Sequence, residues 1–111
     1  MFQLAAQLVL DVYRATAGFP KSEVLGLTGQ MRRAAASIPV NLAEGAARAG
    51  AKEFAQFVNI AIGSCEEVRY QLRLAQAPSY VPKAEQQRLD GRYEIVKKML
   101  AKLFGAVSRE L

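Results

Sequence analysis

A line of polar side chains runs along one predicted helix, within residues 27–48 (LTGQMRRAAASIPVNLAEGAAR). At about 100° per residue, six side chains fall within about 80° of one another on the helical wheel. These are Gln30, Arg33, Ser37, Asn41, Glu44 and Arg48. The adjacent face is apolar, so the line follows the edge of a core. An unpaired buried polar group costs about 1 to 3 kcal/mol. We therefore expect this helix to meet groups that satisfy these side chains.

Two interpretations of this polar line are open. In the structural one, Arg33, Asn41 and Glu44 form a buried network that fixes helix register or subunit docking. Glu44→Ala should then disturb folding or assembly by a few kcal/mol. In the functional one, basic residues gather at a groove and contact phosphates, with Gln30 and Asn41 adding hydrogen bonds. The basic candidates for that role are Arg32, Arg33, Arg48 and Lys52.

The charge balance permits binding to nucleic acid or to an acidic protein, but does not require it. The chain has 15 basic and 10 acidic residues, a net charge of +5 and a pI near 9.7. Residues 83–109 alone carry +4. Lys97, Lys98 and Lys102 in this segment form a second group of candidates for phosphate contact. A charged helix face can also simply keep a protein soluble, so this alternative role of the three lysines stays open.

The residues needed for most catalytic or metal sites are missing from the sequence. The chain has no histidine, and its single cysteine, Cys65, lies between apolar neighbours (IAIGSCEEV) and is expected to be buried. No Cys/His cluster could hold zinc, and no glycine-rich phosphate loop is present. We expect no catalytic residues, no metal and no cofactor, and therefore a protein that is not an enzyme.

The N-terminal segment FQLAAQLVLDVY does not resemble a secretion signal, because it lacks a basic start and is interrupted by Asp11. No apolar run approaches the roughly 18 residues that span a bilayer. We expect a soluble cytoplasmic protein with no membrane contact.

Four helices are predicted from apolar residues at spacings of three and four. They cover about residues 2–16, 28–48, 51–77 and 82–110, with Thr28 as the N-cap of the second helix. Pro39 lies inside that helix, where its ring crowds the carbonyl of Ala35 and should produce a kink. Short loops join the four, which predicts an all-α, antiparallel, up-down-up-down four-helix bundle forming one domain over residues 1–111.

Gly63 lies in the middle of the third predicted helix, away from the core stripe. A mid-helix glycine costs about 1 kcal/mol relative to alanine, so a close neighbour is expected there. A second helix of the bundle or a second subunit could approach. We expect a subunit contact and hence a homo-oligomer.

The motifs of this chain resemble those of the family of four-helix bundle proteins encoded in intervening sequences of bacterial 23S ribosomal RNA. The resemblance covers nearly the whole chain. The matching residues are Phe19, Pro20, Glu23, Gly26, Leu27, Gln30, Arg32, Arg33, Ala34, Ala35, Ser37, Ile38, Pro39, Asn41, Ala43, Glu44, Gly45 and Arg48, followed by Lys52, Glu53, Phe54, Gly63, Ser64 and Glu67.

The resemblance implies a bundle that assembles into a ring, with a pentamer as the expected size. It extends to the accessory variability determinant of diversity-generating retroelements, a basic, nucleic-acid-binding partner of a reverse transcriptase. RNA, DNA and a reverse transcriptase are thus the partners that the resemblance suggests, besides further copies of the chain.

The sequence therefore predicts a non-enzymatic bundle that forms a homo-oligomer and binds nucleic acid weakly through basic surface residues. The alternative is a protein-interaction or scaffold module without nucleic-acid binding. Added salt distinguishes the two, because phosphate contacts weaken steeply with salt whereas an apolar interface does not.

Overall fold

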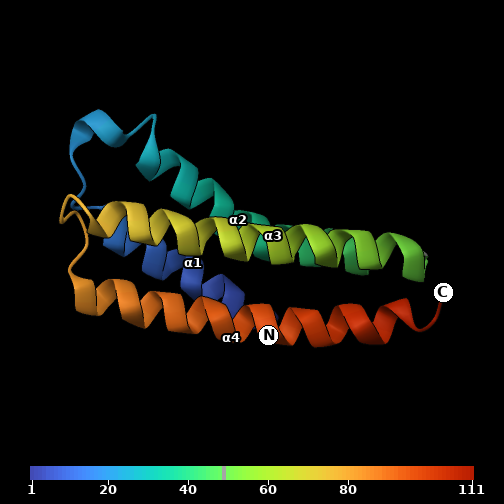
Figure 1. The fold of residues 1–111 in the computed structure, drawn as a ribbon. Coiled ribbons are helices and arrows are strands. Elements are labelled where there is room, and N and C mark those ends of the chain that lie inside the picture. The colour runs from blue at the N-terminus through green and yellow to red at the C-terminus, as the bar shows by residue number, and fades with distance from the viewer. Residues whose placement is uncertain (49) are drawn as a thin grey trace.

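Four long helices form the whole fold in a computed structural model that describes residues 1–48 and 50–111 (Figure 1). They are α1 (Phe2–Thr16), α2 (Leu27–Ala46), α3 (Ala51–Gln76) and α4 (Lys83–Ser108), with a short 3-10 turn, η1 (Lys21–Glu23), before α2. Successive helices run in opposite directions (Figure 1), and the described residues contain no strand. The predicted all-α, up-down-up-down bundle is confirmed.

One apolar core runs along the inside of the bundle. α1 packs against both α2 and α4, and α3 packs between α2 and α4. Because α1 has 15 residues and α3 and α4 have 26 each, α1 covers only one half of the bundle (Figure 1). The other half is built from α2, α3 and α4. The largest fully buried side chains are Tyr93, Leu8, Met31, Ile38, Leu72, Leu89 and Leu100.

The Phe-Pro-x-x-Glu segment closes the end of the bundle at which α1 ends and α4 begins. The ring of Phe19 lies 5.3 Å from that of Tyr80, in the loop between α3 and α4. The Tyr80 hydroxyl donates a hydrogen bond to Glu23 Oε2 at 3.2 Å. Glu23 Oε1 accepts a hydrogen bond from the Leu27 amide at 3.4 Å, so Glu23 satisfies a free donor at the start of α2.

The predicted N-cap of α2 was wrong. Gly26 occupies that position, and Thr28 is buried inside the helix, where its hydroxyl has no hydrogen-bond partner among the described residues. The helix begins earlier than expected because the carboxylate of Glu23 supplies the acceptor from outside the helix.

α2 continues through Pro39 as one helix. In Figure 1 its first turns slant away from α3, and its later turns lie along α3. The close approach there involves Gly45, since a Cβ on this residue would lie 2.8 Å from Cβ of Phe57 and 3.0 Å from Cδ1 of Phe54. A Cβ on Gly63 would have no neighbour within 4 Å, so no helix of the same chain approaches Gly63 closely.

Candidate functional site

The middle of the predicted polar line joins α2 to α3. Ser37 Oγ lies 2.9 Å from Ser64 Oγ on α3, and the two hydroxyls share a hydrogen bond. Asn41 Nδ2 donates to the Ser37 carbonyl at 2.7 Å and to Ser37 Oγ at 2.9 Å. Ser37 therefore links α2 to α3 through Ser64, and Asn41 bonds to Ser37 within α2.

The outer members of the line do not join this cluster. The Glu44 carboxylate lies 3.7 Å from the Arg48 guanidinium, and both side chains are about half exposed, at 54% and 48%. Arg48 also reaches Glu53 at 4.0 Å and stacks over Phe57. Gln30 and Arg33 are exposed and make no side-chain hydrogen bond among the described residues. The polar line therefore does not form one buried network within a single chain. An exposed ion pair such as Glu44–Arg48 contributes only about 0 to 1 kcal/mol to stability.

Among the first group of basic candidates, Arg32 is engaged in the fold. Its Nε donates to Thr16 Oγ1 on α1 at 2.8 Å, and one Nη donates to the Tyr13 carbonyl at 3.3 Å. Its guanidinium also lies 4.4 Å from the centroid of the Tyr13 ring. Arg32 therefore fastens α1 to α2. Arg33 and Lys52, in contrast, have no acidic partner among the described residues.

The second group of basic candidates is mostly neutralised by carboxylates. Lys97 Nζ lies 3.0 Å from Glu66, and Lys98 Nζ lies 3.0 Å from Glu94. Lys102 is exposed and has no ion pair among the described residues. Of these three candidates for phosphate contact, only Lys102 is therefore without a carboxylate partner among the described residues.

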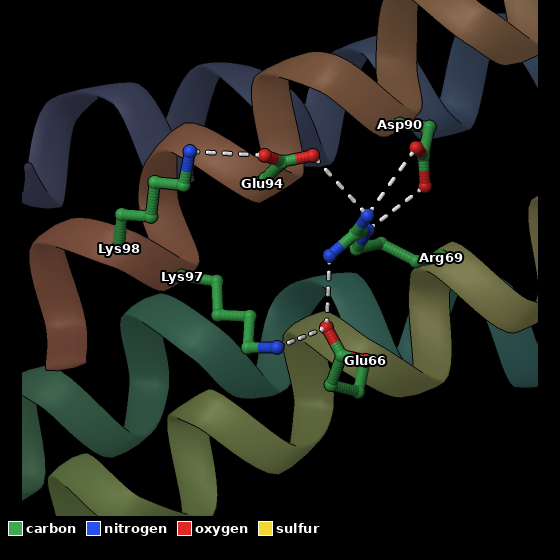
Figure 2. Close-up of polar contacts among 6 residues, drawn as sticks. All are labelled: Glu66, Arg69, Asp90, Glu94, Lys97 and Lys98. Atoms are coloured by element: carbon green, nitrogen blue, oxygen red, sulfur yellow. Dashed lines mark hydrogen bonds and ion pairs between the residues drawn. The ribbon is translucent and has the colours of Figure 1, made fainter.

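Arg69, which the sequence interpretation did not single out, is the centre of these ion pairs (Figure 2). Its guanidinium contacts Asp90 at 2.9 Å, Glu66 at 3.1 Å and Glu94 at 3.4 Å, and its side chain is only 14% exposed. The hydrogen bond to Asp90 is the main reason that the pKa of Arg69 is raised. The hydrogen bond from Lys97 is the main reason that the pKa of Glu66 lies below its ordinary value. The charges between α3 and α4 thus stabilise each other.

Large apolar side chains are exposed along α1 and α3. On α1, Phe2, Leu10 and Tyr13 lie within about 80° on the wheel and are all exposed; we call them the α1 apolar line. A second line lies on the outer side of α3, at intervals of three and four residues. This α3 apolar line consists of Ile60, Tyr70 and Leu74, with Gly63 and Glu67 at the positions between Ile60 and Tyr70.

Cys65, the single cysteine of the chain, is buried in the core. Burial raises the pKa of the Cys65 thiol to about 12, which makes it a poor nucleophile at neutral pH. No pocket and no group of three or more metal-ligating side chains occurs in residues 1–48 and 50–111. None of the helices in these ranges is long and apolar enough to cross a membrane.

Comparisons with known proteins agree with this fold. The sequence model of the family described as 23S rRNA-intervening sequence protein matches residues 1–102. One similar solved structure is the crystal structure of a protein with unknown function from the S23 ribosomal protein family of Bacteroides thetaiotaomicron. It superposes with a TM-score of 0.85 over 94% of each chain at 16% sequence identity, which shows a common fold. No curated protein matches the sequence.

Proposed function

We propose a function for this chain as a member of the 23S rRNA-intervening sequence protein family, to which it belongs by the match over residues 1–102. In this proposal the chain is a non-enzymatic helical bundle that assembles with copies of itself and acts as a scaffold. The geometry supports this function through surfaces made of exposed side chains rather than through a pocket.

The observation that carries this proposal is the uneven distribution of surface side chains. The α1 apolar line exposes Phe2, Leu10 and Tyr13, and the α3 apolar line exposes Ile60, Tyr70 and Leu74. Most ion pairs, in contrast, lie on or against α4. Exposed apolar residues are ordinary when scattered singly, but a continuous apolar surface marks an interaction site. α2 also exposes Val40, which lies among small residues. The charged residues of this helix are Arg32, Arg33 and Glu44.

Sedimentation velocity of the purified chain tests this proposal. We expect a concentration-dependent species with a mass that is a multiple of the 12.1 kDa chain, and the family resemblance makes five copies the expected number. Because the contact is apolar, the species should persist at 1 M salt. A single species of chain mass at all concentrations up to the millimolar range would overturn the proposal.

Nucleic-acid binding is a second candidate function, favoured by the net charge of +5 and by exposed cations without an acidic partner. Among the sequence candidates these are Arg33, Lys52 and Lys102. Because these cations lie on three different helices, one chain offers few phosphate contacts at any one place. An assembly of several copies would repeat each cation. A reverse transcriptase or another protein as partner stays a hypothesis from the family resemblance.

Fluorescence anisotropy of labelled RNA and DNA duplexes, titrated over a salt series, tests the second candidate. We expect the logarithm of the binding constant to fall linearly with the logarithm of the salt concentration. Arg33→Ala and Lys52→Ala should each reduce the slope, whereas the control Lys98→Ala should change it less because Glu94 already neutralises Lys98. No binding at low salt would leave the scaffold function alone.

A further inference from the structure

In one half of the bundle, the described residues place three helices where the other half has four (Figure 1). α2 and α4 both pack on α3, but they do not contact each other anywhere in residues 1–48 and 50–111. Where α1 is present, it packs against both α2 and α4. Because a four-helix bundle closes its core with four helices, the half beyond Phe2 has an uncovered position between α2 and α4.

Two arginines identify the side chains that border this position. Arg32 marks the α1 edge of α2, because it bonds to Thr16. Arg88 marks the α1 edge of α4, because it reaches Asp11. The residues that continue these edges lie within about 60° of the two arginines on the helical wheel. They are all apolar, and we call them the α2/α4 face: Ala36, Pro39, Ala43 and Ala46 on α2, and Met99, Leu103 and Ala106 on α4.

The α2/α4 face has the side chains of a helix contact rather than those of a solvated surface. Met99 is 42% exposed, Ala43 and Ala46 are exposed, and Leu103 is half-buried. The distance between packed helices depends on the side chains at the contact, so the small residues of α2 allow a close approach. The flexible side chain of Met99 adapts to the shape of a neighbour. An additional helix in line with α1 therefore meets apolar side chains on both edges.

Charge indicates what this additional helix carries at its border. On the α4 edge, Asp11 of α1 lies 3.9 Å from Arg88. Lys102 lies on the same edge of α4, within about 40° of Arg88 on the wheel. It is exposed and has no ion pair among the described residues, and α4 contains no acid after Glu94. A carboxylate on the additional helix would meet Lys102 as Asp11 meets Arg88.

A second copy of the chain does not offer a helix of this kind. A helix that covers a core presents an apolar stripe of at least about 100°. The α1 and α3 apolar lines, which are the exposed apolar surfaces of those helices, span only about 80° each on the wheel. Glu67 also interrupts the α3 line. The occupant is therefore a helix whose wide apolar side is not already buried in a bundle of its own.

We propose that the α2/α4 face binds an amphipathic helix of a partner protein, with a wide apolar side and carboxylates along the border next to α4. The bound helix lies in line with α1 and completes the fourth position of the bundle. This site is separate from the α1 and α3 apolar lines, so it does not depend on the self-association proposed above.

Two synthetic helical peptides of about 15 residues test this site. They share one apolar side, and their border positions carry glutamate in one peptide and lysine in the other. Fluorescence anisotropy of each labelled peptide with the full chain measures binding. We expect the glutamate peptide to bind about threefold to tenfold more tightly than the lysine peptide at low salt. Lys102→Glu should reverse this order.

Three further variants locate the binding site. Met99→Asp on α4 and Ala43→Asp on α2 should each weaken binding of the glutamate peptide at least about tenfold. Val24→Asp is the matched control, since Val24 is 56% exposed but lies in the loop before α2, and it should bind like the unaltered chain. Circular dichroism melting shows whether each variant is folded.

The remaining outcomes separate this proposal from the proposed function. Equal binding of both peptides, or binding that Met99→Asp and Ala43→Asp leave unchanged, would show that the α2/α4 face is not the site. If neither peptide binds and Met99→Asp abolishes self-association, copies of the chain cover this face and the proposed partner is wrong. A chain that sediments as a monomer and binds the glutamate peptide would overturn the proposed assembly but support the α2/α4 face as a binding site.

Discussion

The guanidinium of Arg69 on α3 and the carboxylate of Asp90 on α4 form a two-pronged contact across the bundle (Figure 2). Nε donates to Oδ1 at 2.9 Å and Nη2 donates to Oδ2 at 3.5 Å, with both side chains mostly buried. Glu66 and Glu94 occupy further donors of the same guanidinium. Because the geometry is fixed by several partners, Arg69 sets the register of α3 against α4.

Replacing Asp90 should destabilise the fold more than replacing any exposed charge. Asp90→Asn keeps the size of the side chain but leaves Arg69 without its main counter-ion. We expect a loss of about 1 to 3 kcal/mol in the free energy of unfolding, less than for a fully buried pair because water reaches both groups. Urea denaturation at pH 7 measures this. The control Lys98→Ala, at a 74% exposed side chain, should cost less than about 0.5 kcal/mol, and equal losses would contradict the role of Arg69.

Acid should weaken the contact between α3 and α4 through Glu66. The folded pKa of Glu66 lies below its ordinary value of 4.5, mainly because Lys97 donates a hydrogen bond to the carboxylate. Ionised Glu66 therefore stabilises the fold above about pH 4.5, and this contribution is lost as the pH falls through the folded pKa. Glu66→Gln should lower the Tm at pH 7 and should make a smaller difference near about pH 3. A Tm difference that is the same at both pH values would show that the ionisation of Glu66 plays no part.

The sequence predicted the four helices and the ends of most of them, because apolar residues repeat every three to four positions and Gly and Pro separate the segments. It did not predict which charges pair. Arg69 and Asp90 are 21 residues apart, and only the packing of α3 on α4 brings them together. The same holds for the polar line on α2. The wheel places Ser37 and Glu44 on one face, but the position of α3 decides that Ser37 is bonded and Glu44 is exposed.

Gly45 of α2 and Gly63 of α3 should respond in opposite ways to replacement by alanine. Gly45→Ala places a Cβ 2.8 Å from Cβ of Phe57, which cannot move without its backbone. We expect a loss of about 1 to 3 kcal/mol from overpacking, despite the better helix propensity of alanine. Gly63→Ala meets open space and should gain up to about 1 kcal/mol. Thermal unfolding at a concentration where the chain is monomeric measures the stability of both variants. A stabilising Gly45→Ala would contradict the close approach of Gly45 to α3.

Arg32 and Arg33 are adjacent in sequence but should have separable roles. Arg32→Ala removes the hydrogen bonds to Thr16 and to the Tyr13 carbonyl, together with the contact to the Tyr13 ring. We expect a loss of about 1 to 3 kcal/mol and faster amide hydrogen exchange in α1, because the last turn of this helix loses its anchor on α2. Arg33→Ala is the matched control and should change stability by less than about 0.5 kcal/mol, since its side chain is exposed. If nucleic acid binds, Arg33→Ala should weaken binding more than Arg32→Ala at a temperature where both variants are folded. An Arg32→Ala variant with unchanged stability and the larger loss of binding would instead make Arg32 the phosphate ligand.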